Sequence, residues 1–82
     1  MPREEIQNRT TPDYVPLRDQ GDVPVIARLI LKNGGEVWRP ATAHRWTEAH
    51  IHVSFHGRGD TAWLRAEDVV QEIHGPLQLR RV

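Results

Sequence analysis

Alternating hydrophobic and polar positions dominate the middle of the chain. The alternation begins near Val23, after which every second residue is apolar: Val25, Ala27, Leu29 and Leu31. It is cleanest over residues 50–56, where apolar residues alternate with polar ones: Ile51, Val53 and Phe55 with His50, His52, Ser54 and His56. Because successive side chains of a strand point to opposite faces, each run predicts a strand with one face toward a core.

Two further strands are predicted on either side of residues 50–56. Over residues 36–46, strict alternation places Arg39 and Arg45 on one face and Trp38 and Trp46 on the other. Pro40 cannot donate a hydrogen bond to a strand ladder, so we expect an edge position or a bulge near it. Residues 61–65 form the next strand, with alternating faces: Ala62 and Leu64 on one, Thr61, Trp63 and Arg65 on the other.

Turn residues separate these strands at short intervals. Asn33-Gly34-Gly35 and Gly57-Arg58-Gly59-Asp60 supply the glycines of tight hairpins, and Thr47-Glu48-Ala49 makes a polar turn. Residues 66–70 predict one short helical turn, and residues 69–74 a last strand. Short strands with tight turns and no long helix predict an all-β fold, a small five-stranded antiparallel barrel.

Both ends of the chain lack this alternation. Residues 1–22 contain three prolines, scattered charges and few apolar residues, which predicts an extended or disordered N-terminal arm. Four apolar side chains of the arm could dock on the folded part or on a partner: Ile6, Tyr14, Val15 and Leu17. The barrel domain is expected over residues 23–75, and residues 76–82 form a basic C-terminal tail.

Composition narrows the classes of protein to which the chain can belong. Its 82 residues allow one domain, and the absence of cysteine excludes disulfides and thiolate metal sites. A formal net charge of zero argues against the strong positive field that drives non-specific nucleic-acid binding. Without an apolar run of membrane-spanning length or an apolar signal core, we expect no membrane partner and a cytoplasmic location.

Three segments together resemble the Tudor branch of the SH3-like barrels, over about residues 24–73. They are Gly35-Glu36-Val37-Trp38-Arg39-Pro40-Ala41-Thr42-Ala43, Val53-Ser54-Phe55-His56-Gly57-Arg58-Gly59-Asp60 and Ala66-Glu67-Asp68-Val69-Val70. The resemblance implies a strongly bent five-stranded barrel, whose relatives bind peptides, often methylated ones, through an aromatic cage.

The cage positions of this family fall near Lys32, Arg39, Phe55 and Arg58, so only Phe55 is aromatic, although a shift of one residue would bring in Trp38. Cations would repel a methyl-ammonium group, which needs several aromatic faces around it. We therefore expect the fold of the family without its usual ligand.

The tryptophans suggest a non-enzymatic binding module or small accessory protein. Trp38 and Trp63 are predicted to face outward, where a bare indole should be covered. The arm could cover them through Tyr14 and Leu17, their strand faces could be inverted, or another protein could dock, including a second copy of the chain. For a protein partner, the predicted binding residues are Trp38, Arg39, Phe55, Arg58 and Trp63.

An alternative function is nucleic-acid binding through a stripe of cations and aromatic residues. The predicted stripe comprises Lys32, Arg39, Arg45, Trp46, Arg58 and Arg65. Neighbouring acids such as Glu36 and Glu67 would instead give these positions a mixed, solvated surface.

Metal binding and catalysis have weaker signals in the sequence. His50 and His52 form a His-x-His pair near His44 and His56, but no fourfold ligand set is evident, so we expect neither metal nor cofactor. Ser54 is the one serine and lies in mid-strand, and a histidine beside Asp60 or Asp68 could act as a base. So small a barrel offers a deep pocket only as an oligomer, which leaves an oligomeric enzyme as the third hypothesis.

Overall fold

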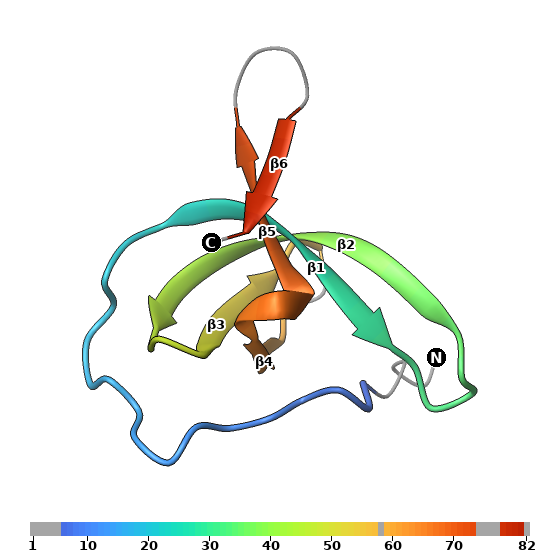
Figure 1. The fold of residues 1–82 in the computed structure, drawn as a ribbon, viewed down its shortest axis with the longest axis horizontal. Helices are drawn as coiled ribbons and strands as arrows, with labels where there is room; N and C mark the ends of the chain where they lie inside the picture. The colour runs from blue at the N-terminus through green and yellow to red at the C-terminus, as the bar shows by residue number, and fades with distance from the viewer. Residues whose placement is uncertain (1–5, 58, 74–77, 82) are drawn as a thin grey trace.

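The computed structural model describes residues 6–57, 59–73 and 78–81, whose strands form one antiparallel sheet. The elements are β1 (Val23–Ile30), β2 (Glu36–Trp46), β3 (His50–Phe55), β4 (Thr61–Arg65), the 3-10 turn η1 (Ala66–Asp68), β5 (Val69–Ile73) and β6 (Gln78–Arg81). The strand order is β4-β3-β2-β1-β5-β6 (Figure 1). The all-β antiparallel fold predicted from the alternation is therefore confirmed.

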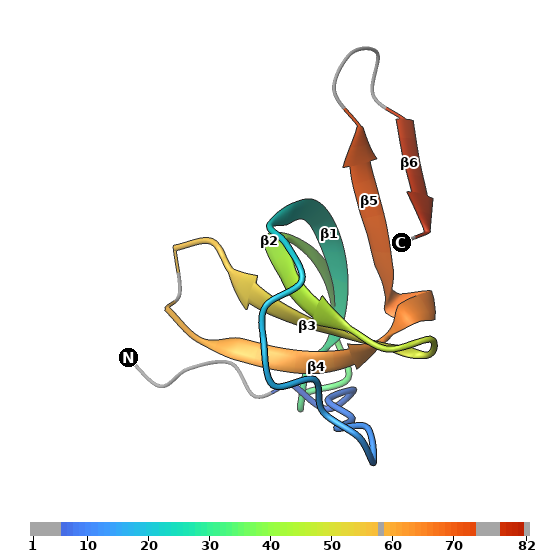
Figure 2. The ribbon, with the colours of Figure 1, turned by 90° about the vertical axis from the view of Figure 1, so that its left-hand side faces the viewer.

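A sixth strand extends the sheet beyond the five that the sequence predicted. β6 pairs antiparallel with β5 inside residues 76–82, which were predicted to form a basic tail. Beyond the residues of β5 that pair with β1, strands β5 and β6 project away from the other four strands (Figure 2). The predicted strand end at His74 lies outside the described residues.

The β1–β2 hairpin forms where Asn33, Gly34 and Gly35 predict it. Gly34 has φ +88°, a left-handed conformation that suits glycine. The Oδ1 of Asn33 accepts a hydrogen bond from the N–H of Gly35 at 2.8 Å, and the N–H of Leu31 donates to the carbonyl of Gly35 at 2.8 Å. This turn sets β1 and β2 in register from Ile30 and Glu36 onward.

A bulge in β2 changes the face of its last residues. The β2–β3 register shifts between Ala43 and Arg45, close to the irregularity that Pro40 predicts. The extra residue moves Arg45 to the outer face, where it pairs with His52. It also turns Trp46 toward the core, against which Trp46 packs. The strict alternation predicted over residues 36–46 is therefore wrong beyond Ala43.

The core lies on the inner face of the curved sheet. It is built from small and branched side chains of β1 to β5 with one residue of the arm: Ile6, Val25, Ala27, Leu29, Ala41, Ala43, Ile51, Val53, Phe55, Ala62, Leu64 and Val69. The inward alternation predicted for residues 50–56 and 61–65 is confirmed. Phe55 is only 4% exposed, because it belongs to this inward set.

The arm is extended and docked over the part that the structure describes. Ile6 is buried and forms a bridge with Leu31, and the N–H of Gln7 donates to the carbonyl of Ile30 at 2.7 Å. Further along, the N–H of Thr10 donates to the carbonyl of Trp63 in β4 at 2.9 Å. Residues 6–10 thus cross from the end of β1 that β5 does not pair with to the free edge of β4.

The last part of the arm continues the line of β1 along β2. The N–H groups of Gln20 and Gly21 both donate to the carbonyl of His44, at 2.7 and 3.3 Å. The side chain of Gln20 accepts from the N–H of Trp46 at 2.7 Å. Tyr14 and Leu17 remain 72% and 90% exposed, so they are not the contacts that dock the arm.

In the described part of the chain, no helix has both the length and the apolar character that a membrane crossing requires.

Candidate functional site on the outer face of the sheet

The outer face of the sheet, opposite the core, divides into an apolar and a polar half. Directly opposed residues of antiparallel strands share a face. Ile26 lies opposite Pro40 of β2 on one side and Val70 of β5 on the other. Trp38 is on the same face, opposite Arg28. We call Ile26, Trp38, Pro40 and Val70 the apolar patch.

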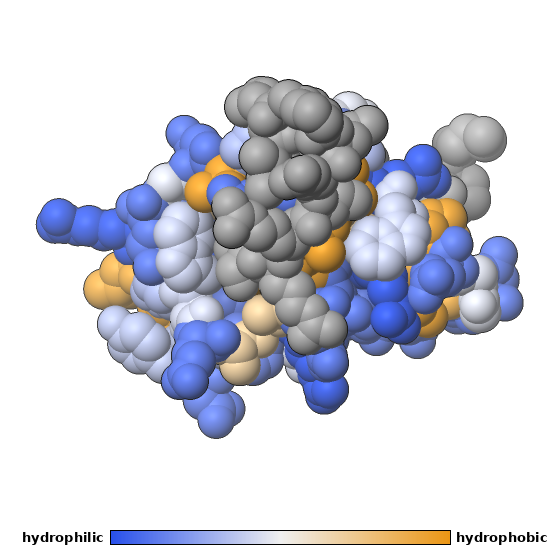
Figure 3. Space-filling view, turned by 45° about the horizontal axis from the view of Figure 1, so that its top comes forward, coloured by the Kyte–Doolittle hydropathy of each residue, from blue (hydrophilic) through white to orange (hydrophobic). Residues whose placement is uncertain are grey.

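Trp38 is the most exposed indole of the described residues that stands on a strand. Its side chain is 48% exposed, whereas Trp46 and Trp63 are half-buried. On the polar side of the patch, Arg28 is held by Glu36, with Nε 2.8 Å from Oε1. Figure 3 shows the hydrophobic residues in separate groups among hydrophilic ones. On the face in this view, the exposed apolar residues therefore stand in small groups with hydrophilic borders.

A row of side chains crosses the polar half from β2 to β4. Arg45 lies opposite His52, and His52 lies opposite Trp63. The ring centroids of His52 and Trp63 are 5.0 Å apart, tilted by 38°. The ring of His52 therefore partly covers Trp63. The expected covering of the indoles by Tyr14 and Leu17 is wrong, because both of these side chains are exposed.

Arg45 ties the arm to this row. Its Nε donates to Oδ1 of Asp19 at 2.9 Å, and its Nη1 donates to the carbonyl of Pro16 at 3.1 Å. The hydrogen bond from Arg45 holds the pKa of the Asp19 carboxyl below its usual range. Arg45 therefore serves as an anchor for the arm.

Burial and a neighbouring cation lower the pKa of His52. The first cause is desolvation, followed by the charges of Arg45 and His44. Consistently, Nδ1 of His52 is buried and has no hydrogen-bond partner among the described residues. The folded state thus disfavours the protonated imidazole.

This shift predicts how stability changes with pH. His52 binds a proton less readily in the folded chain than in the unfolded one, whose pKa is near 6.5. The contribution of His52 to the free energy of unfolding is therefore fully present above the unfolded pKa. It decreases as the pH falls below that value. Chemical denaturation between about pH 8 and pH 5 should show a smaller acid-side loss of stability for His52→Gln than for the wild type. An unchanged loss would contradict the shift.

The five residues predicted to bind a protein do not form one surface. Trp38 and the row of Trp63 are separated along β2, since Arg45 of that row comes seven positions after Trp38. At the rise of a strand this is on the order of 20 Å. Arg39 is exposed but lies opposite Ala27, on the core side of β2. Phe55 is in the core and unavailable to a partner, which corrects that prediction. Arg58 lies outside the described residues.

The predicted nucleic-acid stripe is also divided. Arg45 is paired with Asp19, and Nη1 of Arg65 lies 3.7 Å from Oε1 of Glu67. Trp46 is partly buried against the core and is turned away from the outer face by the bulge. Lys32 lies in the first hairpin and Arg39 follows it on β2, and both are exposed. Arg45 and Arg65 of the predicted stripe therefore lie beside acidic side chains, as on a surface of mixed charge.

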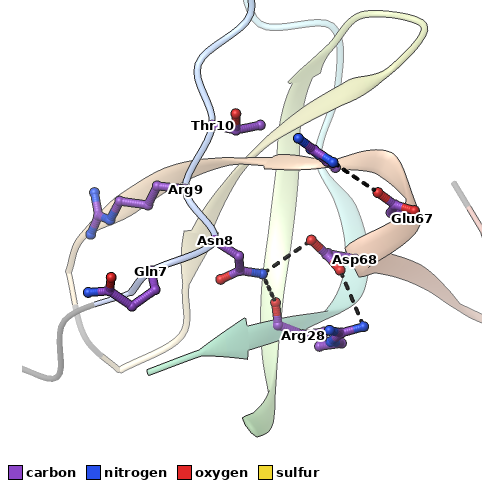
Figure 4. A pocket seen from close by; sticks show the side chains of 8 residues that line it. Gln7, Asn8, Arg9, Thr10, Arg28, Glu67 and Asp68 are labelled. Atoms are coloured by element: carbon purple, nitrogen blue, oxygen red, sulfur yellow. Dashed lines mark hydrogen bonds and ion pairs between the residues drawn. The ribbon is translucent and has the colours of Figure 1, made fainter. Parts of the chain in front are cut away.

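A polar cavity of about 410 Å³ lies where the arm meets the 3-10 turn. Its lining comprises Gln7, Asn8, Arg9, Thr10, Arg28, Arg65, Glu67 and Asp68. Figure 4 shows Asn8 pointing from the arm toward Asp68 and the backbone of Arg28. The Nδ2 amide of Asn8 donates to the carbonyl of Arg28 at 2.9 Å and to Oδ2 of Asp68 at 3.2 Å. The cavity thus contains the polar contacts that hold the arm.

Sequence reasoning missed Asn8 and Asp68 as structural partners. Asp68 is 8% exposed, and Nη1 of Arg28 lies 3.7 Å from its Oδ1. The residues are 60 positions apart, and neither stands in a pattern that would pair them. A polar asparagine shortly after Ile6 was the one available signal for docking of this segment.

Four histidines of the described residues, His44, His50, His52 and His56, lie on the outer face but do not gather around a common point. No three histidine, aspartate or glutamate side chains in the described ranges are placed to hold a metal ion. Nε2 of His56 instead contacts Oγ1 of Thr42 at 2.8 Å. His44 contacts Ser54 and Asp22, a set that the sequence did not reveal because the three residues come from different segments.

Comparisons of the chain with protein-family models, with curated proteins and with solved structures found no match.

Proposed function

We propose that the chain is a small binding module of SH3-like, Tudor-type architecture that docks a protein partner. Three features support the barrel. β1 to β4 form consecutive hairpins, the 3-10 turn follows β4, and β5 returns to pair with β1. The long β2 pairs with β1 over one part and β3 over another, as a bent barrel strand does. Residues 6–10 of the arm bridge the gap between the end of β1 and the edge of β4, which brings the two sides of the sheet together.

The apolar patch is the proposed docking surface, and the exposure of Trp38 carries the proposal. Tryptophan is among the residues that most often contribute binding energy at protein interfaces. Trp38 is 48% exposed, with Ile26, Pro40 and Val70 beside it on strands whose inner sides form the core. The sheet therefore fixes the backbone of Trp38, and little backbone ordering is required when a partner binds.

The chemistry of the patch favours protein over nucleic acid. A phosphate backbone requires cations, whereas Arg28 beside Trp38 is neutralised by Glu36 at 2.8 Å. An apolar surface with one charged pair at its border suits a partner with an apolar patch and complementary charges. Such an accessory protein would act by docking its partner on the apolar patch, with Trp38 as the central contact.

Replacing Trp38 with alanine should reduce partner binding at least tenfold, because a central interface tryptophan typically contributes about 2 kcal/mol or more. The fold should remain intact, since the indole is not part of the core cluster. The measurement is the amount of partner retained by the immobilised chain, compared at equal folded fraction by circular dichroism.

The matched control is Tyr14→Ala, which removes another exposed aromatic ring, 72% exposed on the arm. It should leave binding unchanged. Equal losses for both variants, or a loss only for Tyr14→Ala, would refute the apolar patch as the docking surface. Nuclease treatment and a salt series complete the test, because affinity that falls steeply with salt would indicate nucleic acid. Light scattering distinguishes a second copy of the chain from a different partner.

A further inference from the structure

Three side chains on the polar half of the outer face form a hydrogen-bonded chain of hydroxyl, imidazole and carboxylate. Oγ of Ser54 lies 2.7 Å from Nε2 of His44. Nδ1 of the same ring lies 2.9 Å from Oδ1 of Asp22. Ser54 is the only serine in the chain. The order and distances are those of a serine nucleophile with its base and orienting acid.

The bulge and the arm together build this arrangement. Thr42 lies opposite Ser54, and the extra residue at the bulge brings His44 beside Ser54 on the outer face. The carbonyl of His44 accepts hydrogen bonds from the N–H groups of Gln20 and Gly21. These bonds hold the end of the arm in place, so that Asp22 reaches the other side of the imidazole.

The contacts determine which nitrogen carries the proton. A carboxylate only accepts hydrogen bonds, so Nδ1 of His44 donates to Asp22. Nε2 of the neutral ring is then left as an acceptor for the hydroxyl of Ser54. This tautomer is the one required for a base that removes the proton from a serine hydroxyl.

We propose that Ser54 is an acyl-accepting nucleophile that cleaves small activated esters, with His44 as its base and Asp22 orienting His44. Oγ of Ser54 attacks the ester carbonyl carbon while its proton passes to Nε2 of His44. The bond from the carbonyl carbon to the alkoxy oxygen then breaks, and the proton on Nε2 goes to the departing alcohol or phenol. Water then gives a proton to the same nitrogen while its oxygen bonds to the acyl carbon. The bond from the acyl carbon to Oγ of Ser54 breaks, the carboxylic acid leaves, and Nε2 of His44 returns its proton to Oγ.

The position of Ser54 limits the class of substrate. Ser54 pairs with Thr42 on β2 and with Thr61 on β4, so the surrounding backbone N–H groups belong to the sheet ladders. The developing oxyanion therefore receives little help from the backbone, which favours aryl esters with a good phenolate leaving group. The side chain of His44 is 24% exposed, which gives small acyl donors access from solvent. This activity is separate from docking at the apolar patch.

The same face contains a matched control. Nε2 of His56 lies 2.8 Å from the hydroxyl of Thr42, a pair like that of Ser54 and His44. Within the described residues, no carboxylate contacts the second nitrogen of His56. His56→Gln should therefore leave acylation unchanged, whereas changes in the Ser54 set should reduce it.

The test uses the full chain with p-nitrophenyl acetate, following release of p-nitrophenolate and locating the acetyl group by peptide mass spectrometry. We expect one acetyl group on Ser54. Ser54→Ala and His44→Gln should lower the rate of release at least tenfold, in line with general-base contributions of about 10²–10⁴-fold. Asp22→Asn tests the orienting role without disturbing the core, because its side chain is 81% exposed, and it should give an intermediate loss.

Acetylation confined to lysine, histidine or the amino terminus would overturn the proposal, as would an unchanged rate in Ser54→Ala. A rate that falls in His56→Gln as much as in His44→Gln would show a general effect of surface imidazoles and would also overturn it. Because Trp38 takes no part, the proposed docking function stands or falls by its own test.

Discussion

Replacing Phe55 with alanine is expected to lower the free energy of unfolding by about 3–5 kcal/mol, the usual cost of truncating a buried phenylalanine. Phe55 is 4% exposed within the core cluster, so its truncation leaves a cavity in the core. In a domain of this size such a loss approaches the whole stability. Urea denaturation followed by circular dichroism measures the effect.

Phe55→Leu and Trp38→Ala distinguish this core role from a binding role. Phe55→Leu keeps most of the buried volume and should cost much less than Phe55→Ala. Trp38→Ala removes a half-exposed ring and should change the unfolding free energy little. A Phe55→Ala chain of wild-type stability would contradict the placement of Phe55 and would restore it as a candidate contact residue.

Replacing Asn8 with alanine is expected to cost about 1–3 kcal/mol, because partly buried partners would lose their hydrogen bonds. The Oδ1 of Asn8 accepts from the N–H of Ile30 at 3.0 Å, and its amide donates to Arg28 and to Asp68. These bonds continue the edge of β1 beyond the residues that pair with β5. Thermal and chemical denaturation of the full chain measure the loss.

Gln7→Ala is the matched control for Asn8→Ala. Gln7 is an exposed neighbour on the same segment, and its hydrogen bond to the carbonyl of Ile30 comes from its backbone N–H, which alanine keeps. It should therefore leave stability almost unchanged. If Asn8→Ala and the wild type have the same free energy of unfolding, the hydrogen bonds of Asn8 do not stabilise the fold. Hydrogen exchange at the N–H of Ile30 would then be equally fast in both chains.

The strands were predictable because the inward positions repeat with a period of two. Residues 50–56 and 61–65 keep that period, and the structure confirms their faces. Arg45 and Trp46 exchanged faces because a bulge adds one residue, and nothing in their local sequence marks its position. For Phe55, the alternation indicated the core correctly, whereas the family resemblance suggested a cage wall on the surface.

Contacts between distant segments could not be predicted from the sequence. Asn8 meets Asp68, and Asp22 meets His44, only after the arm has crossed the sheet. These contacts depend on single polar side chains, which carry no periodic signal. The exposure of Trp38 was predicted from its strand face, but its separation from Trp63 required the observed register. The sequence therefore predicted which residues of the strands face outward, except at the bulge of β2. It did not predict that these residues divide into an apolar and a polar half.

Photo-crosslinking from position 38 tests the proposed docking surface most directly. A chain with a photoreactive phenylalanine derivative in place of Trp38 would be irradiated with its partner bound, beside a second chain with the same group in place of Tyr14. We predict a crosslinked complex from position 38 and none from position 14. A complex formed from position 14 alone would contradict docking at the apolar patch.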